Sequence, residues 1–252
     1  MNELFDLRGK KAIVTGGGKG VGEGITNGLA MAGAKVLIIG SSPQTAELAG
    51  HLSVDGKDVK GLQGDLSRLE NIPPLFDQSV EMLDGLDILV NNAAIQVRQP
   101  AMEFSLADWQ RVIDVNVSAS FFLCQCAAKQ MIPKKYGKII NIASMTSFFG
   151  SYNVAAYAAS KGAVAQMTKS LSNEWAPLGI NVNAVAPGGF KTEMTKALWS
   201  DPKTDEMAME RTPAGRWGTA SDIMGSIIFL ASHASDYVCG AILPVDGGYL
   251  AR

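Results

Sequence analysis

The sequence lacks most of the features that mark secreted, metal-binding, membrane and nucleic-acid-binding proteins. Its three cysteines in 252 residues are too few for a disulfide scaffold, so we expect reduced thiols. No apolar run approaches the ~18 residues that span a bilayer, and residues 1–11 lack the apolar core of a signal peptide. The 22 basic and 24 acidic residues nearly balance, which gives no electrostatic footprint for nucleic acid.

These absences favour a soluble cytoplasmic protein that binds a small molecule, with neither nucleic acid nor membrane among its partners. The two histidines, His51 and His233, have no partner at ligand spacing, so no metal site is expected.

What the sequence does contain is a regular alternation of short β-branched runs with longer helix-like segments. The apolar runs are nearly continuous, which is typical of strands covered on both faces of a parallel sheet. Right-handed crossovers then produce a doubly wound sheet whose ligands bind beyond the carboxyl ends of the strands. No linker or repeat divides residues 1–252, so we expect one Rossmann-type α/β domain with helices on both faces of the sheet. The expected strands are 12–14, 35–39, 59–63, 87–90, 138–142, 180–185 and 241–243.

The segment 188–212 differs from the rest of the chain. It is rich in Met, Lys and Thr, has no clear strand period and lies between a strand and the last helical region. An insertion at the ligand edge of the sheet is a candidate substrate lid. An ordinary surface excursion is the alternative.

A glycine-rich turn, Thr15-Gly-Gly-Gly-Lys-Gly-Val-Gly22, follows the first expected strand and opens a helix. Glycines allow the backbone to turn tightly and to approach a pyrophosphate, whose charge is favoured at a helix N-terminus. The turn therefore predicts a dinucleotide site, although a glycine-rich turn alone can be a mere tight connection.

Tyr157 and Lys161 stand four residues apart, so on a helix their side chains share one face. A free tyrosine has a pKa of about 10 and is a poor base at neutral pH. A neighbouring ammonium favours the phenolate and brings the tyrosine nearer the working range. The pair predicts a proton-transfer group, because four further motifs accompany it in order along the chain.

Together these motifs resemble the short-chain dehydrogenase/reductase family. Residues 15–22 match its T-G-x-x-x-G-x-G turn, and 91–94 (NNAA) match its N-N-A-G turn except at Ala94. Ser144 follows a strand and precedes the Tyr157–Lys161 pair, and Pro187-Gly188 with Thr192 matches a further family segment. The matches extend over nearly the whole chain. They imply hydride transfer between a nicotinamide cofactor and a carbonyl or secondary alcohol.

The resemblance also assigns roles to individual residues. It implies that Tyr157 transfers the proton, that Ser144 holds the reacting oxygen, and that Lys161 lowers the tyrosine pKa and binds the nicotinamide ribose. Asn116 matches the family's helical asparagine, which holds a water linking the lysine to solvent; an ordinary helix-interior polar residue is the alternative. The implied cofactor contacts are Gly16, Gly18, Lys19, Gly20, Val21, Gly22, Ser41, Ser42, Asp65, Leu66, Asn92, Ala93, Tyr157, Lys161, Pro187, Gly188, Phe190 and Thr192.

The cofactor itself is expected to be NADP in modest preference to NAD, which stays open. NAD enzymes of this fold usually place an acid at the end of the second strand, where this chain has Gly40-Ser41-Ser42. No carboxylate there repels a 2′-phosphate, and Lys19 stands where many NADP-using relatives carry a basic residue; a solvated lysine is the alternative. Asp65 meets the adenine amine if the resemblance holds, and it can also cap a helix.

Within the family the chain is most similar to sugar-acid dehydrogenases of the 2-deoxy-D-gluconate 3-dehydrogenase (2-dehydro-3-deoxy-D-gluconate 5-dehydrogenase) and gluconate 5-dehydrogenase type. Such a substrate needs a partner for its carboxylate. Arg98, in the loop after the N-N-A motif, is the leading candidate because a guanidinium can hold a carboxylate through two parallel hydrogen bonds. Lys191 and Arg216 are alternatives, and Arg216 can instead be a structural ion-pair residue. The resemblance is carried by residues 138–148, 173–176, 213–218 and 246–252.

Two other functions remain open. A 3-oxoacyl-carrier-protein reductase shares the catalytic residues, but it needs a basic docking surface that the charge balance does not suggest. A non-catalytic nucleotide-binding protein of the same fold would have no need of Asn116, Ser144, Tyr157 and Lys161 together. The family resemblance further implies a homotetramer that assembles through the helices holding Asn116 and Tyr157.

Overall fold

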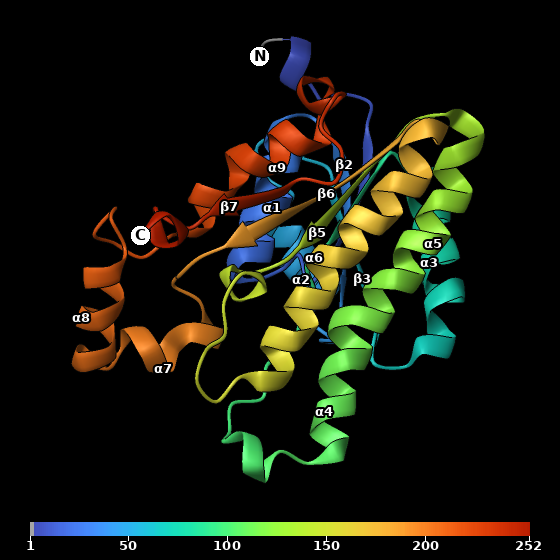
Figure 1. The fold of residues 1–252 in the computed structure, drawn as a ribbon. Coiled ribbons are helices and arrows are strands. Elements are labelled where there is room, and N and C mark those ends of the chain that lie inside the picture. Colours follow the sequence, from blue (N-terminus) through green and yellow to red (C-terminus); the bar gives the residue numbers. More distant parts are fainter. Residues whose placement is uncertain (1–2) are drawn as a thin grey trace.

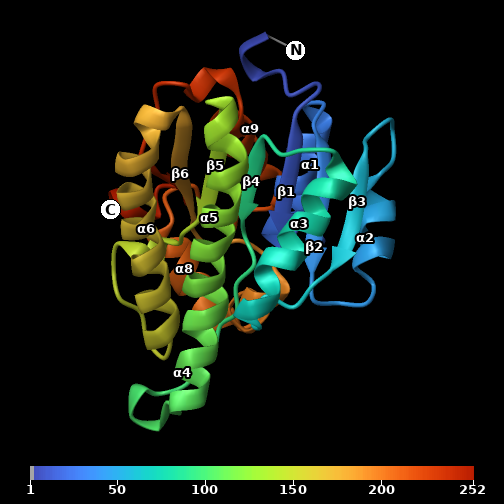
Figure 2. The same ribbon diagram turned by 90° about the vertical axis from the view of Figure 1, so that its right-hand side faces the viewer.

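A parallel sheet of seven strands organises the protein, whose computed structural model describes residues 3–252. The strand order is β3-β2-β1-β4-β5-β6-β7, and every neighbouring pair is parallel (Figures 1 and 2). The doubly wound fold is thus confirmed, and the expected strands differ from the observed ones by at most two residues at either end. The strands are β1 Lys11–Thr15, β2 Lys35–Gly40, β3 Val59–Gln63, β4 Ile88–Asn91, β5 Gly137–Ile142, β6 Ile180–Pro187 and β7 Ile242–Val245.

Helices cover both faces of this sheet (Figures 1 and 2). One face packs against α1, α2 and α9, and the other against α3, α5 and α6. No helix within residues 3–252 is both long and apolar enough to cross a bilayer. The helices are α1 Gly20–Met31, α2 Thr45–Leu52, α3 Ile72–Leu83, α4 Leu106–Ile113, α5 Ala119–Met131, α6 Ala155–Trp175, α7 Lys196–Trp199, α8 Pro202–Arg211 and α9 Met224–Ala231.

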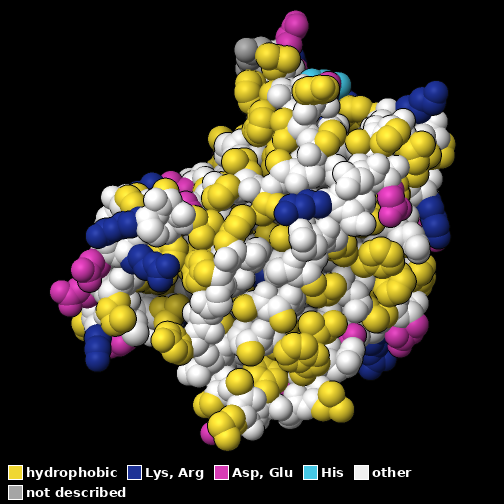
Figure 3. All heavy atoms as spheres, in the orientation of Figure 1, with side chains coloured by type: hydrophobic (Ala, Val, Ile, Leu, Met, Phe, Trp, Pro, Cys, Tyr) yellow, Lys and Arg dark blue, Asp and Glu magenta, His cyan; other side chains and the backbone are white. Residues whose placement is uncertain are grey.

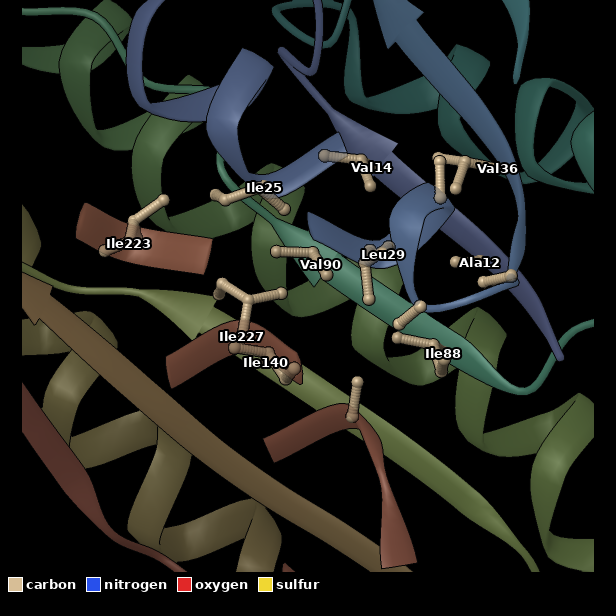
Figure 4. Close-up of a cluster of buried hydrophobic side chains, with 14 of the residues drawn as sticks. Ala12, Val14, Ile25, Leu29, Val36, Ile88, Val90, Ile140, Ile223 and Ile227 are labelled. Carbon is tan, nitrogen blue, oxygen red and sulfur yellow. The ribbon is translucent and has the colours of Figure 1, made fainter. Parts of the chain in front are cut away.

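Each central strand contributes to both layers of the core because its successive side chains point to opposite faces. Val14 belongs to the same buried cluster as Ile25 and Leu29 of α1 and Ile227 of α9 (Figure 4), whereas the adjacent Ile13 belongs to the other layer. All five side chains are fully buried. This double burial explains why the strands read as continuous apolar runs rather than as alternating ones.

The connections around β1 create the place where a ligand can enter. From β1 the chain winds outward through β2 to β3, and it then returns to β4 on the opposite side of β1. The loops that leave β1 and β4 therefore diverge at the carboxyl edge of the sheet. Crevices at such switch points are where open α/β sheets bind ligands.

Candidate active site

A cavity of about 820 Å³ lies at this carboxyl edge. It is lined by residues from the loops that follow six successive strands, β1 to β6. Most of the residues expected from the sequence line it, while Gly18, Ser42, Asn116 and Arg98 do not. The expected residues in its wall are Gly16, Lys19, Gly20, Val21, Gly22, Ser41, Asp65, Leu66, Asn92, Ala93, Ser144, Tyr157, Lys161, Pro187, Gly188, Phe190 and Thr192.

The glycine-rich turn needs glycine at Gly16, Gly20 and Gly22. Gly16 and Gly20 have φ values of +64° and +56°, which side chains rarely adopt. A Cβ on Gly22 would lie 2.0 Å from the Gly16 carbonyl oxygen. The Asn92 side-chain amide donates to the Thr15 and Gly16 carbonyls over 3.0 and 2.9 Å, which ties this turn to the loop after β4.

A dinucleotide fits this arrangement. The turn leads directly into the N-terminus of α1. The N-cap residue of this helix is Lys19, whose cationic side chain makes no capping hydrogen bond. Backbone amides at a helix N-terminus favour a pyrophosphate. Thr192 lies close to the same turn, and a Cβ added to Gly20 would lie 3.1 Å from the methyl group of Thr192. Residues 16–22 and 187–192 therefore line two sides of the cavity where such a cofactor would lie, with the pyrophosphate at 16–22.

Ser144 and Tyr157 meet at the inner end of the cavity. Ser144 lies two residues beyond the end of β5. It caps a short 3₁₀ turn, Met145–Ser147, because its hydroxyl accepts a hydrogen bond from the Thr146 backbone N–H over 3.1 Å. Tyr157 lies in the first turn of α6. Burial raises the pKa of the Tyr157 phenol, and a hydrogen bond with Ser144 offsets part of that rise.

Lys161 is buried one helical turn beyond Tyr157. Its Nζ lies 5.7 Å from the centroid of the Tyr157 ring and donates a 2.6 Å hydrogen bond to the Ile142 carbonyl. Burial lowers the pKa of Lys161 from 10.5 to about 8, because the ammonium loses its hydration there. The protein thus holds a costly cation close to the phenol, although the pKa of the phenol stays above its ordinary value.

This cost leads to a stability prediction for Lys161→Met. Between pH 8 and 10.5 the unfolded chain binds a proton at Lys161 that the folded chain has released, so the stability of the wild type rises with pH across that window. Below pH 8 the full cost of the buried charge remains. We expect Lys161→Met to be more stable than the wild type by about 1–2 kcal/mol at pH 7, after allowing for the lost hydrogen bond to Ile142.

Urea unfolding at pH 7, 8.5 and 10 measures this difference, which should shrink as the pH rises. Lys169→Met, on the exposed side of the same helix, is the matched control for replacing a lysine of α6 by methionine. A Lys161→Met variant that is less stable than the wild type at pH 7 would contradict the interpretation.

Asn116 lies behind the cavity rather than in its wall. It occupies a π-helical turn, Asp114–Ser118, between α4 and α5. Its Oδ1 accepts from the Ile95 N–H over 2.9 Å, and its Nδ2 donates to the Ile95 carbonyl and to Ser160 Oγ, each over 3.0 Å. Ser160 Oγ in turn donates to the Tyr157 carbonyl over 2.7 Å. Asn116 therefore connects the loop after β4 to the helical turn that carries Tyr157.

The adenosine side of the cavity differs in one respect from the sequence interpretation. Asp65 does not cap a helix, because the next helical turn begins only at Leu69. Instead, its Oδ1 accepts from the backbone N–H and the hydroxyl of Ser67, over 2.9 and 2.7 Å, in a local turn. These hydrogen bonds lower the pKa of Asp65 and keep the carboxylate ionised. Ser42, unlike Asp65, does not line the cavity; its hydroxyl donates to Gln44 in the loop after β2.

The segment 188–212 forms two short helices, α7 and α8 (Figure 1). Its residues before α7, from Gly188 to Thr195, contribute to the cavity wall, whereas no residue of α7 or α8 does. Neither helix has a fully buried residue. Polar contacts hold the segment: Trp199 Nε1 donates to the Thr192 carbonyl over 3.2 Å, and Trp217 Nε1 donates to Asp205. Few apolar contacts and several exposed polar ones are typical of segments that open locally.

The candidate carboxylate partners occupy different settings. Arg98 is exposed in the loop after β4, three residues beyond Ile95, which does line the cavity. Arg216 is engaged elsewhere, since its guanidinium donates to both carboxylate oxygens of Asp222 over 2.8 Å. Lys191 lies over the ring of Trp199, 5.8 Å from its centroid.

Sequence reasoning missed several residues in the cavity wall, among them Ile95, Arg111 and Val115. Val115 could have been found from its place directly before Asn116, and Arg111 from its place one helical turn earlier. Among residues 3–252, no group of three or more His, Cys, Asp or Glu side chains is arranged to hold a metal ion.

Comparisons with known proteins agree over the full length of the chain. A sequence model of a family described as short chain dehydrogenase matches residues 10–203. The 2-dehydro-3-deoxy-D-gluconate 5-dehydrogenase of Bacillus subtilis (strain 168) is 46% identical over 254 residues, which cover 100% of this chain and 99% of that protein. The gluconate 5-dehydrogenase of Gluconobacter oxydans (strain 621H) is 39% identical, with 98% and 96% covered. A solved structure of gluconate 5-dehydrogenase from Burkholderia cenocepacia J2315, in complex with NADP and tartrate, has a TM-score of 0.95 and 39% identity, with 99% and 98% covered.

Proposed function

Because the chain belongs to the short-chain dehydrogenase family and is an NAD(P)-dependent oxidoreductase, we propose that it interconverts a secondary alcohol and a carbonyl on a gluconate-type sugar acid. One observation carries the chemistry. Tyr157, hydrogen-bonded to Ser144 and next to the buried Lys161, faces the same cavity as the glycine-rich turn. A proton-transfer group and a dinucleotide cradle in one cavity are what a carbonyl reduction or alcohol oxidation requires.

The chain's own side chains perform the proton chemistry in this proposal. The nicotinamide supplies the hydride for reduction and accepts it in oxidation. Tyr157 Oη gives its proton to the oxygen of the carbonyl as that oxygen gains negative charge, and it takes the proton back in the oxidising direction. Ser144 Oγ donates a hydrogen bond that holds this oxygen against Tyr157. Lys161 Nζ favours the phenolate and binds the nicotinamide ribose, and Asn116 holds a water that links the lysine to solvent.

The sugar-acid assignment is supported by the relatives rather than by the cavity. The proteins of Bacillus subtilis and Gluconobacter oxydans act, by their names, on 2-dehydro-3-deoxy-D-gluconate and gluconate. We assign the substrate carboxylate to Arg98. Its exposed side chain makes no hydrogen bond or ion pair with another residue in the range 3–252, and it can extend toward the cavity beside Ile95.

A substrate panel tests the proposal directly. Reduced-nicotinamide absorbance would be followed with NADP and with NAD, using gluconate, 2-deoxy-D-gluconate, neutral polyols of the same length and, in the reverse direction, a β-ketoacyl thioester. We expect turnover of a sugar acid that exceeds turnover of the neutral polyols. Turnover of the thioester alone would replace the sugar-acid proposal with a ketoacyl reductase, and no turnover of any compound would contradict an active enzyme.

The Arg98→Ala variant tests the carboxylate contact. A charge-assisted pair is worth about 1.5–3 kcal/mol, so we expect the KM for the sugar acid to rise about 10- to 100-fold, with kcat changed much less. Steady-state kinetics on the sugar acid and on a neutral polyol measure the effect, and the KM for the polyol should not rise. Lys191→Ala tests the alternative carboxylate partner and is expected to leave the KM for the sugar acid unchanged. An unchanged KM for the sugar acid in Arg98→Ala would assign the carboxylate to another residue.

NADP is our preferred cofactor, supported by two features. Ser41 rather than an acid follows β2 in the cavity wall, and Lys19 lies at the N-terminus of α1 without an ion pair in residues 3–252. The Burkholderia cenocepacia structure contains NADP. We further propose that 188–212 is a substrate lid, because its first part, including Phe190 and Thr195, lines the cavity and its helices α7 and α8 have no buried residue to anchor them.

A homotetramer in the cytoplasm completes the proposal. Large apolar side chains are exposed on the helices next to Asn116: Leu106 and Trp109 on α4, and Phe121 and Phe122 on α5. Hydrophobic side chains are also visible across the surface over α4, α5 and α6 (Figure 3). Exposed apolar patches of this kind mark interaction sites. They support assembly through the helices that carry Asn116 and Tyr157.

A further inference from the structure

Two nearly buried apolar side chains line one part of the cavity wall, and we call the space between them the slot. Leu66 comes from the loop after β3, and Val115 comes from the start of the π-helical turn after α4. They are only 7% and 8% exposed. Asp65, the neighbour of Leu66 in the chain, also lines the cavity. Its Oδ1 is occupied by Ser67, and its Oδ2 has no hydrogen-bond partner within residues 3–252. A flat heterocycle with an exocyclic amine matches both the slot and the free carboxylate oxygen.

Arg111 borders this slot. It lies on α4 four residues before Val115, so the two side chains project from one helix face into the same wall of the cavity. Arg111 is exposed, and within the described residues its guanidinium forms no ion pair or hydrogen bond. Its charge acts on Asp65, where it helps to lower the carboxyl pKa. By contrast, Arg8 and Arg216 are each paired with a neighbouring aspartate.

The cavity wall has few basic side chains for a negatively charged dinucleotide, the ligand that we propose for it. Its wall includes three basic side chains, Lys19, Arg111 and Lys161, and two acidic ones, Asp65 and Glu193. Lys161 is buried beside Tyr157, and Glu193 has its own partner in Lys196. A dinucleotide carries a pyrophosphate and, in NADP, a further phosphate. Arg111 and Lys19 are therefore the two cations of the wall that have no ion pair among the described residues, and Arg111 is the one whose charge acts on Asp65.

We propose that Arg111 is a cofactor-binding residue whose guanidinium closes over the adenine ring once the ring enters the slot between Leu66 and Val115. This inference rests on the proposed function, because it requires an adenine dinucleotide as the cofactor. A guanidinium is planar, weakly hydrated and attracted to the face of an aromatic ring, so it suits a cover of this kind. With no ion pair to break, Arg111 can turn toward the ring without loss of an existing contact.

Titration of reduced-nicotinamide fluorescence tests the proposal on Arg111→Gln and Arg111→Lys. A cation–π contact at a partly exposed site corresponds to about a 5- to 10-fold change in affinity. We expect the dissociation constant of NADPH to rise by that factor in Arg111→Gln, and by less in Arg111→Lys, which keeps the charge but not the planar group. The KM for NADPH should rise by the same factor, while kcat stays within about twofold.

Two controls separate adenine binding from other effects. Arg68→Gln removes a second cation that acts on Asp65 but does not line the cavity, so it should leave NADPH affinity within about twofold. 2′,5′-ADP contains the adenine but no nicotinamide. Its dissociation constant, measured by calorimetry, should rise in Arg111→Gln by the same factor as that of NADPH.

Unchanged NADPH affinity in Arg111→Gln would overturn the proposal, and so would an equal loss in Arg68→Gln or an unchanged affinity for 2′,5′-ADP. These results are distinguishable from a failure of the proposed function. A wild type that binds NADPH but oxidises no sugar acid would contradict the substrate assignment and leave the role of Arg111 standing.

Discussion

The Tyr157→Phe variant is expected to lose about 10³- to 10⁴-fold in turnover while its affinity for NADPH stays within about twofold. General acid–base catalysis contributes up to about 10⁴-fold, and Oη is the atom of Tyr157 that exchanges a proton with the substrate oxygen. The change leaves the ring in place in the buried first turn of α6. Stopped assays with the sugar acid measure turnover, and fluorescence titration measures cofactor binding.

Tyr152→Phe provides the matched control for that experiment. Tyr152 lies in the loop before α6, only five residues from Tyr157, and is 91% exposed. It should therefore keep wild-type turnover. Near-normal activity in Tyr157→Phe would remove the assignment of the proton-transfer group, and with it the mechanism proposed for Ser144 and Lys161.

The Gly22→Ala variant is expected to lose cofactor binding by a factor of about 100 or more and stability by about 2–4 kcal/mol. Its new Cβ would lie 2.0 Å from the Gly16 carbonyl oxygen and 2.7 Å from Asn92 Nδ2, and the first of these atoms belongs to the backbone. Either the turn or α1 must shift, and overpacking of this kind typically costs about 1–3 kcal/mol and occasionally more. The shift also disturbs the hydrogen bonds from Asn92 that shape the turn.

Gly50→Ala is the matched control, because a Cβ on Gly50 in α2 has no heavy atom within 4 Å. It should bind NADPH normally and be as stable as the wild type or more stable by about 0.5–1 kcal/mol, since alanine favours a helix interior. Urea unfolding and NADPH titration of the two variants give the comparison. If Gly22→Ala bound NADPH as tightly as the wild type does, residues 16–22 would not form the cofactor cradle.

The fold could be predicted from the sequence because its signals are local. A strand buried on both faces has to be apolar along its whole length, so runs such as 35–39 and 138–142 indicate strands without reference to any partner. The residues at which the strands begin and end were predicted less accurately. β6 extends two residues beyond its expected end, to Pro187, because pairing with β7 continues as far as Val245.

The part of the site that could be predicted is the part whose residues are close together in the sequence. Tyr157 and Lys161 share a helix face by spacing alone, and both line the cavity. Asp65 shows the limit of such reasoning. An aspartate before a helical run reads as a cap, but Ser67 satisfies its carboxylate locally and the next helical turn starts later, at Leu69.

Periodicity and short spacings were enough to predict the parallel sheet, the glycine turn and the Tyr157–Lys161 pair, because each of these features lies within one element or one turn. Only the tertiary structure brought Ser144 to Tyr157, connected Asn116 to Ile95 and Ser160, and placed Arg111 in the cavity wall. It also decided that Lys161 is buried and that its pKa falls to about 8. Burial and contacts between distant segments depend on how the elements pack against one another, which no spacing along a single element records.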